Sequence, residues 1–316
     1  MDNKVLTGLK RVVIQSSGLL IIGLIWQIAP ALGWVDSMFV PSLSTTVKAL
    51  IKLWIVNDLY MHILSSLWRV LSGLLIASAI AIPLGFIFGR WFPSIYEAVE
   101  PLLRIFTKVN PFSLIPIFIL LFGFGEAIRI AVVTWVCIWP ILFGTVTGLR
   151  TIDKDLIKAA VSMKVSPLGL ILKVLLPGSM HAIFTGLRLG VEMSFFILIA
   201  GEMLGANSGL GVIIHNSNHF FNMPRLYASA LVVVLLGVFL NLFLKYLQNG
   251  LFFWKEPHHI FGSVHEDKPG TKIGRVELLI LSVIIGLLLV LGSQQIQKAA
   301  EIAADPTRGY TQDAGN

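Results

Sequence analysis

Seven long runs of apolar residues restrict what this chain of 316 residues can fold into. A helix needs about 20 apolar residues to cross the hydrocarbon core of a bilayer. The chain is 56% hydrophobic and 13% charged, and its mean hydropathy is +0.83. A water-soluble domain could not bury that much apolar surface. The sequence therefore predicts an all-α protein, a polytopic bundle of membrane helices.

The apolar runs predict six core membrane helices and one additional helix. The core helices form one membrane domain within residues 1–254. A polar linker over residues 255–275 leads to the additional helix within residues 276–294, and a polar tail over residues 295–316 is expected to be disordered. The predicted spans are Val13 to Leu32, Ile63 to Gly89, Leu102 to Phe124, Ile128 to Leu149, Ile183 to Leu204, Tyr227 to Leu247 and Val276 to Leu291.

Basic residues predict the orientation of these spans, because Lys and Arg in short loops are retained on the cytoplasmic side. Lys10 and Arg11 place the N-terminus in the cytoplasm, and alternation of the spans places the C-terminal tail outside. The first run also has features of a secretion signal, but it is long for one and is expected to remain as a membrane helix. The net charge of +7 is spread over separate inner loops, so it indicates topology and not a nucleic-acid surface.

Motifs for hydrolytic chemistry are absent from the sequence. It has no GxxxxGK(S/T) phosphate-binding loop, no HExxH and no GxSxG, so the chain is not expected to be an enzyme. Cys137 is the single cysteine, and His215 and His219 have no carboxylate or cysteine nearby in the sequence, so no metal site is expected. Transport, signalling and scaffolding remain as functions for a protein with many membrane spans.

A polar segment from Asp153 to Pro177 separates two of the apolar runs. Asp153 begins a helical pattern, apolar residues recur at helical spacing after it, and Pro167 breaks that pattern. The segment therefore predicts two short helices at an angle, in water. We call residues 150–178 the elbow. From its pattern alone, the elbow is either a docking surface or an amphipathic helix on the inner face of the membrane.

The elbow resembles the EAA loop of permease subunits of binding-protein-dependent ABC importers. KAAVSMK at residues 158–164, followed by Leu176 and Pro177, follows the motif of EAA, three residues, Gly and a later Leu-Pro. Further blocks resemble the branch that transports nitrate, sulfonates, taurine and bicarbonate, in the same order along the chain. They are FVPSLSTTVKAL, SLWRVLSGLLIASAIAIPLG, NPFSLIPIFILLFGFGE and GLRLGVEMSFFILIAGEMLGANSGLG, and the resemblance covers about Val13 to Trp254.

The resemblance implies a type I importer permease in a bacterial inner membrane, which imports a small solute. It implies that the elbow seats in a dimer of cytoplasmic ABC ATPase subunits, which bind ATP and Mg, so that this chain itself holds no cofactor. It also implies a second copy of the chain, or a different permease in its place, and an extracytoplasmic solute-binding protein, with lipid around the bundle. The residues implied in coupling to the ATPase are Lys158, Ala159, Ala160, Met163, Lys164, Val165 and Pro177.

The chain departs from the EAA motif at two positions. Lys158 stands where the motif has Glu, and Lys164 stands where it has Gly. Glycine permits backbone angles that lysine resists, so the geometry of the loop is expected to differ. Because both changes add positive charge, we hypothesise a partner groove that is more acidic than usual.

Two further groups of residues are candidates for contact with solute. Residues predicted to line a translocation path are Glu192, Met193, Ser194, Asn110, Trp135 and Trp139. Residues predicted to form an outer gate are Glu202, Asn207 and Gly209. For the path residues, the structural alternatives are an ion pair of Glu192 with Arg188 and packing of the tryptophans in the core. For the gate residues, the alternative is a glycine-rich connector. An ion-coupled secondary transporter and a scaffold without transport are alternatives for the function of the whole chain.

Overall fold

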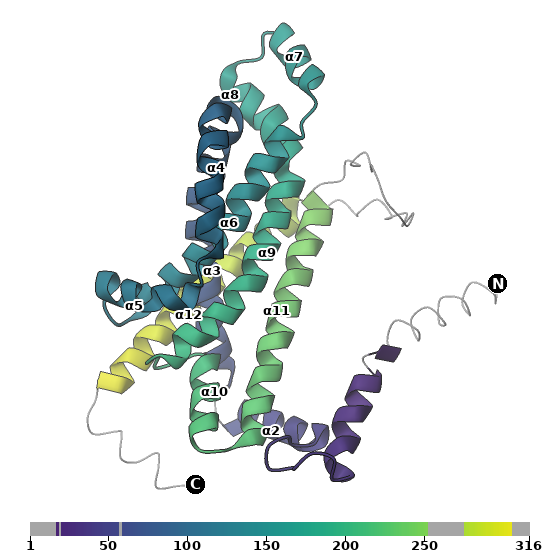
Figure 1. Ribbon diagram of the computed structural model, residues 1–316, viewed down its shortest axis with the longest axis vertical. Coiled ribbons are helices and arrows are strands. Elements are labelled where there is room, and N and C mark those ends of the chain that lie inside the picture. Colours follow the sequence, from purple (N-terminus) through teal and green to yellow (C-terminus); the bar gives the residue numbers. More distant parts are fainter. Residues whose placement is uncertain (1–16, 19, 57–58, 252–274, 305–316) are drawn as a thin grey trace, which may run out of the picture. The chain divides into compact units, whose positions relative to one another are not determined.

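Helices account for all the regular secondary structure in residues 17–18, 20–56, 59–251 and 275–304, the residues that the computed structural model describes (Figure 1). The all-α prediction is confirmed for these residues. Three features of the sequence analysis lie outside the described residues. They are the basic residues Lys10 and Arg11, nearly all of the linker, and the end of the tail. The helices are Leu20–Ala31, α2 (Leu43–Val56), α3 (Leu59–Phe86), α4 (Pro93–Lys108), α5 (Pro111–Phe122), α6 (Glu126–Arg150), α7 (Lys154–Ser162), α8 (Pro167–Leu170), α9 (Leu176–Met203), α10 (Leu210–His219), α11 (Met223–Leu251) and α12 (Arg275–Ala304).

The chain divides into two compact units. The first unit comprises residues 1–60 with 213–233, and the second comprises residues 61–212 with 234–316. In the first unit, the indole of Trp26 donates to the carbonyl oxygen of Pro41 at 3.0 Å and its ring lies 6.1 Å from that of Tyr227. The side chain of Gln27 accepts from the backbone N–H of Ser44 at 2.9 Å. The helix Leu20–Ala31 is therefore fixed against the start of α2.

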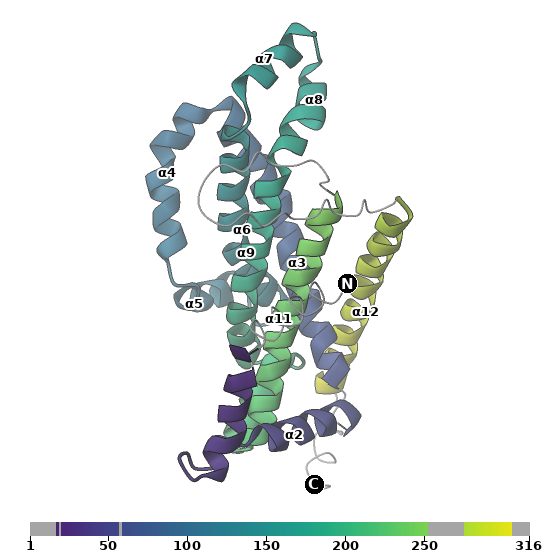
Figure 2. The same cartoon turned by 90° about the vertical axis from the view of Figure 1, so that its right-hand side faces the viewer.

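An antiparallel hairpin of α6 and α9 forms the centre of the second unit, and both views show the two helices side by side (Figures 1 and 2). Small residues allow this close approach. A β-carbon at Gly186 would lie 2.5 Å from the backbone oxygen of Pro140, and one at Gly148 would lie 2.9 Å from that of Ser179. Helices in a bilayer gain little from apolar burial against each other, so close backbone packing at small residues stabilises their contact instead.

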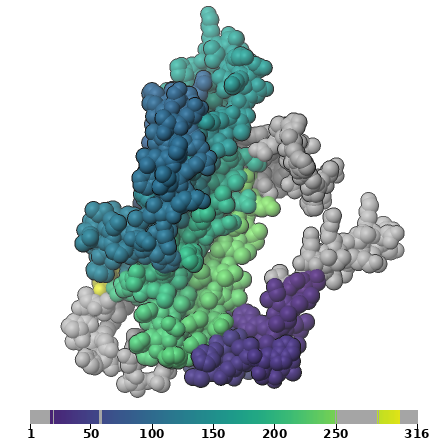
Figure 3. Space-filling model, viewed as in Figure 1, coloured from purple at the N-terminus to yellow at the C-terminus, as the bar shows by residue number. Residues whose placement is uncertain are grey.

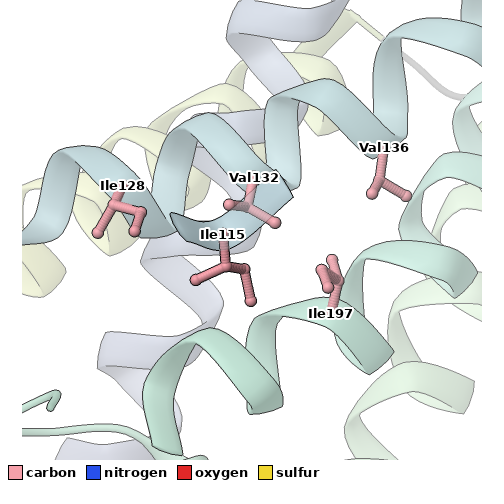
Figure 4. Packing of buried hydrophobic residues seen from close by; sticks show 5 residues of the cluster. All are labelled: Ile115, Ile128, Val132, Val136 and Ile197. Carbon is pink, nitrogen blue, oxygen red and sulfur yellow. The ribbon is translucent and has the colours of Figure 1, made fainter. Parts of the chain in front are cut away.

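The helix α5 packs on this hairpin through a small apolar cluster. Ile115 of α5 belongs to one cluster of buried side chains with Ile128, Val132 and Val136 of α6 and Ile197 of α9 (Figure 4). The aromatic residues Phe118 and Trp135 pack around the cluster. The cluster therefore holds α5 across the side of the hairpin.

The predicted spans agree with the structure at four places. Single helices long and apolar enough to cross a membrane are Leu59–Trp91, Glu126–Arg150, Pro167–Met203 and Met223–Gln248 among the described residues. The described part of the first predicted span is the helix Leu20–Ala31, which is shorter than a crossing requires. The additional helix is present as α12, and it continues to Ala304. The prediction of a disordered tail was therefore wrong for residues 295–304.

The predicted third span from Leu102 to Phe124 is broken into two helices in the structure, which together are long and apolar enough for one bent span. In the structure, α4 and α5 are separate helices that meet at an angle of 93° (Figure 2). The side chain of Asn110 accepts from the backbone N–H of Phe112 at 3.0 Å, and Pro111 begins α5. A side-chain cap followed by proline starts a new helix, because proline lacks the N–H that would continue the previous one. The break between the two helices therefore falls at Asn110 and Pro111.

Candidate functional site

The elbow begins as its sequence predicts. Asp153 caps α7 by accepting from the backbone N–H of Asp155 at 2.8 Å, and Ser166 caps α8 by accepting from that of Gly169 at 3.1 Å. The second helix is not short, however. α8 continues through a π-helical turn, η2 (Ile171–Leu175), into α9, so that Pro167–Met203 is one helical run. Pro177 does not end this run either, and it lies two residues after the π-helical turn, which is an irregularity of the helical hydrogen bonding.

Lys164 ends α7 in the left-handed conformation, with φ at +55°. The backbone N–H of Lys164 donates to Val161 at 2.9 Å, and that of Val165 donates to Ala160 at 3.2 Å. Helices often end on such a residue, and it is usually glycine because a β-carbon is strained there. Lys164 therefore has the left-handed backbone that favours glycine, which is the residue the EAA motif has at this position.

The two faces of the elbow differ in burial. One face packs on the bundle, where Ile152 and Ile157 join a cluster built on Phe86, Leu149 and Leu175. The other face is exposed and carries both charge and large apolar side chains. Its exposed residues include Leu156, Lys158, Val161, Met163, Lys164, Leu168 and Leu172. Of the predicted coupling residues, Ala159 is also exposed, whereas Ala160 is buried.

Four charged side chains meet at the other end of the α6–α9 hairpin. Arg69 of α3 donates to both carboxylate oxygens of Glu126, through Nε at 2.6 Å and Nη2 at 2.8 Å. Its Nη1 donates to Glu202 of α9 at 2.7 Å. Arg129 donates to Glu126 at 3.0 Å. We call Arg69, Glu126, Arg129 and Glu202 the four-charge cluster, and its formal charges sum to zero.

Glu202 also organises the segment between α9 and α10. Its Oε1 accepts from the hydroxyl of Ser66 at 2.7 Å, and its Oε2 accepts from the backbone N–H of Gly211 at 2.8 Å. Arg69 donates to the carbonyl oxygen of Ser208 at 2.7 Å, and Arg129 donates to that of Gly205 at 2.7 Å. The four-charge cluster therefore fixes this segment at both of its ends.

The predicted outer-gate residues fall on this segment. Glu202 is 0% exposed, so its carboxylate is not available to another protein in this conformation. Asn207 is exposed, and Gly209 has a φ of +126° that suits glycine. The gate itself stays a prediction. Arg69, Glu126 and Arg129 were not among the predicted site residues. Each is a charge beside or within an apolar run, which is the signal that pointed to Glu192.

An aromatic cleft of about 580 Å³ lies at the bend between α4 and α5, against α6 and α9. Trp135 and Trp139 stand at its wall with ring centroids 5.1 Å apart, and Phe106 stacks on Trp139 at 5.8 Å. Met193 of α9 also lines it. The structure thus brings together three of the residues predicted for a translocation path. Its other lining residues include Lys108, Pro111, Phe112, Phe143 and Phe196.

Three further path candidates lie outside the cleft lining. Asn110 caps α5 between two lining residues. Ser194 is buried, and its hydroxyl donates to the carbonyl oxygen of Val191 at 2.7 Å. Glu192 is exposed, and Asn241 of α11 donates to it at 2.6 Å. Their role in a path stays a prediction.

Arg188 and Glu192 are joined through α11. Nε of Arg188 donates to the side-chain oxygen of Asn241 at 3.0 Å, and the amide nitrogen of Asn241 donates to Glu192. The expected contact between the two charges is therefore mediated by an amide in this conformation. Such a bridge satisfies both charges and also fixes α9 to α11.

Metal-binding groups do not gather in the part of the chain that the structure describes. Within it, no three His, Cys, Asp or Glu side chains are placed to hold an ion. His215 and His219 are both exposed on α10. Cys137 is buried and is not paired with another cysteine.

The long apolar helices indicate a membrane protein. The exposed elbow and the aromatic cleft beside the central hairpin are compatible with a transport subunit. The chain belongs to the family of binding-protein-dependent transport system inner membrane components, whose family model matches residues 81–252. It is thus an ABC transporter permease, and the predicted resemblance is confirmed.

Similar proteins are named for related solutes. The chain is 30% identical over 238 residues to an aliphatic sulfonate transport permease of Escherichia coli, covering 75% of this chain and 89% of that protein. It is 27% identical over 252 residues to the taurine transport permease of Escherichia coli, covering 78% and 91%. It is 31% identical over 193 residues to a nitrate import permease of Leptolyngbya laminosa, covering 61% and 69%.

The fold also matches a solved importer. The inward-facing MetNI methionine ABC transporter superposes with a TM-score of 0.54 and 18% identity, over 62% of this chain and 96% of the matched chain. This similarity confirms the fold predicted for a type I importer permease.

Proposed function

We propose that this chain forms the solute path of an ATP-driven importer and that the elbow is the surface on which a separate ATPase subunit docks. The observation that carries this proposal is the exposed face of the elbow. Met163 at its tip is 79% exposed, and apolar Val161 and Leu168 are exposed beside the charges of α7. Apolar side chains among charges at an exposed tip are typical of a surface that a partner covers. In the view of Figure 3, no other part of the chain covers the tip of the elbow, which is drawn in teal at the top.

The packing of the elbow supports mechanical coupling. Ile157 of α7 contacts the cluster of Phe86, Leu149 and Leu175, which joins α3, α6 and η2. A displacement of α7 by a partner would therefore shift side chains of the bundle directly. Interiors this closely packed move as bodies instead of deforming gradually, so a small displacement could reorient helices.

The partners follow from this assignment. The elbow would lie in the cytoplasm, against ATPase subunits that bind ATP and Mg. Two copies of the chain would present two elbows to two ATPase subunits, and a solute-binding protein would deliver solute from outside. The names of the similar permeases support sulfonates, taurine and nitrate as the range of solutes.

The charge of the elbow supports a partner groove with acidic residues. Lys158 pairs with Asp155 at 2.9 Å, and the side chains are 76% and 82% exposed. Lys164 is exposed too. Because exposed pairs exchange readily with water, Lys158 is free to bind a carboxylate of a partner instead.

A crosslinking experiment tests the docking surface. Cys137 is buried, so a cysteine placed at an exposed position reacts selectively. We expect Met163→Cys, in complexes purified with the ATPase, to crosslink to that subunit through a maleimide that carries a photoreactive benzophenone, which reacts with C–H bonds of a contacting protein. The matched control is Leu120→Cys on α5, which is 87% exposed and distant in sequence from the elbow, and should not crosslink. Equal crosslinking at both positions would contradict docking at the elbow.

Uptake by reconstituted vesicles tests the energy source. With ATP on the elbow side and all ion gradients collapsed, solute should still accumulate. Accumulation that needs an ion gradient and ignores ATP would instead indicate a secondary transporter.

A further inference from the structure

The helix α2 has three different faces, although it is only 14 residues long. One face is buried and includes Thr46 and Leu53. The next face is exposed and apolar, and the third carries the exposed side chains of Lys48 and Lys52. The exposed apolar residues recur at the spacing of one helix face and are Val47, Ile51, Trp54 and Ile55. Each lysine directly follows an apolar residue of that face, so the lysines lie about 100° further around the helix.

The position of α2 along the chain places these faces at one surface of the membrane. α2 ends at Val56, and α3, which is long enough to cross a membrane, begins at Leu59. The other end of α3 reaches the elbow, because Phe86 packs in the cluster that holds Ile157. α2 therefore lies at the level where the chain enters the bilayer, on the side away from the elbow. α2 is itself too short to cross the bilayer, which needs about 20 residues.

α2 is held in one orientation within its unit. Both views show it crosswise to the first turns of α11, which belong to the same unit (Figures 1 and 2). A helix that lies crosswise to a spanning helix runs along the membrane surface. The side-chain amide of Gln27 donates to the hydroxyl of Ser44 at 3.3 Å and fixes the start of α2 against the preceding helix. Since the opposite face of α2 is buried, the apolar face and the lysine face are both directed away from the protein.

We propose that α2 is an interfacial helix that binds anionic phospholipid, with its apolar face among the acyl chains and with Lys48 and Lys52 on the phosphate groups. Lysines beside an apolar face keep their ammonium groups among the headgroups while their stems cover apolar surface. Trp54 supports this depth, because tryptophan is enriched at membrane interfaces. α2 contains no Asp or Glu, and the ion pairs of the described residues include neither lysine. Both charges are therefore free to bind phosphate.

Anionic lipid also explains why lysines occur on this side of the bundle. With the elbow in the cytoplasm, α2 lies at the outer surface, where Lys and Arg are normally scarce in short segments. Only this choice of leaflet rests on the proposed function. A solute-binding protein would leave the apolar face in water whenever it dissociated, whereas lipid covers that face permanently. The adjacent lysines add an attraction to anionic headgroups that acyl chains alone do not provide.

Quenching by labelled lipids tests the proposal. Cys137 is buried, so Ile55→Cys in the full-length chain can be labelled selectively with the fluorophore NBD. The labelled protein is placed in phosphatidylcholine nanodiscs that contain the same small fraction of doxyl-labelled phosphatidylglycerol or doxyl-labelled phosphatidylcholine. We expect both lipids to quench NBD, and phosphatidylglycerol to quench it about threefold more strongly at low salt. Equal quenching by the two lipids would overturn the proposal.

Two double substitutions separate the lysines of α2 from positive charge in general. Lys48→Gln with Lys52→Gln should remove the preference for phosphatidylglycerol and leave quenching by phosphatidylcholine unchanged. The matched control, Lys154→Gln with Lys173→Gln, removes the same charge from exposed positions of the elbow and should keep the preference. All four lysines are exposed, so these variants should fold as the parent does. A preference that survives in the α2 variant, or that is lost in both variants, would overturn the assignment.

The remaining outcomes identify other occupants of the apolar face, and each overturns the proposal. Quenching of NBD by iodide but by neither lipid would leave α2 in water, where a solute-binding protein could cover it. A disulfide that joins nearly all copies of Ile55→Cys in pairs would place a second copy there. Loss of the preference in excess glycerol phosphate would indicate a site for a soluble phosphate. The measurement needs neither ATP nor a partner, so its failure leaves ATP-driven uptake standing, and failed uptake leaves the lipid site standing.

Discussion

The two ends of the α6–α9 hairpin hold their charges in opposite ways. At the four-charge cluster, Arg69 and Glu202 are each 0% exposed and lie 2.7 Å apart. At the elbow, Lys158 and Asp155 lie 2.9 Å apart, yet both are more than three-quarters exposed. The two distances are almost equal, so burial and not geometry separates these pairs. A buried pair cannot exchange its partner for water without a large desolvation cost, whereas an exposed pair can.

This difference indicates which end fixes the fold and which end can be acted on. The four-charge cluster joins α3, α6, α9 and the segment before α10 with hydrogen bonds that leave few groups unsatisfied. At the elbow, Arg150 contacts Glu97 and the ring of Tyr96. By contrast, α7 itself packs on the bundle through apolar contacts on one face, and Lys158 and Lys164 lie on its exposed face. Substitutions at the two ends should therefore separate stability from partner binding.

The largest effect is expected for Arg69→Met. This change leaves Glu202 buried without its cation, and breaking a buried pair in this way typically costs about 3–5 kcal/mol. The loss should appear as a lowered midpoint of thermal unfolding in detergent. The double substitution Arg69→Met with Glu202→Gln removes both charges and should lose less stability than the sum of the single changes. Additive losses would mean that the two residues do not act as a pair.

A smaller loss of stability is expected when either carboxylate of the same cluster is replaced alone, and Glu202 should matter more than Glu126. Glu202→Gln removes a carboxylate that is fully buried and accepts from Arg69, Ser66 and Gly211, so it should cost about 2 kcal/mol. Glu126→Gln should cost about 1 kcal/mol, because its side chain is 29% exposed and water can replace part of the interaction. Chemical denaturation of both variants gives the order, and a larger loss for Glu126→Gln would contradict the importance of burial.

Local sequence predicted the elbow better than it predicted the four-charge cluster. Asp153 could be identified as a cap because it bonds to a residue only two positions away. Lys164 could be identified as strained because the motif has glycine there, and the φ of +55° agrees. The bend at Asn110 was likewise visible in its prolines. Each of these signals is local.

The four-charge cluster was missed because its contacts are long-range. Arg69 is 57 residues from Glu126 and 133 residues from Glu202 in the sequence. Helical periodicity says which face of one helix is apolar, but it does not say which charges of different helices meet. The continuous helix from α8 to α9 was also missed, because the polar composition around Lys173 masks it and the π-helical turn inserts one residue into the helical period.

At the elbow, Lys164→Gly should raise local stability slightly. Removing the strained β-carbon stabilises the folded loop by about 1 kcal/mol. Glycine also has more conformational freedom in the unfolded chain, which offsets part of this gain, so the net stabilisation is expected to be about 0.5 kcal/mol. Slower hydrogen exchange of the amides at the end of α7 would show it. The control Met163→Gly, where φ is −77°, should instead speed exchange. If both variants behave alike, backbone strain at Lys164 is not the cause.

The smallest effect on stability is expected for Lys158→Ala, and it completes the comparison. The side chain is 76% exposed and pairs only with exposed Asp155, so the free energy of unfolding should change by no more than about 0.5 kcal/mol. The affinity of the Lys158→Ala variant for the ATPase subunit, measured in detergent at low and high salt, should nevertheless fall. The fall should be larger at low salt, where charges are least screened. Lys173→Ala, a control on η2 that is also exposed, should change neither quantity by as much. Because Arg69→Met should do the reverse and destabilise the bundle, the two substitutions together separate a charge that holds helices in place from one that a partner can reach. A Lys158→Ala variant that unfolds early but binds the ATPase normally would show that the elbow belongs to the fold and not to the docking surface.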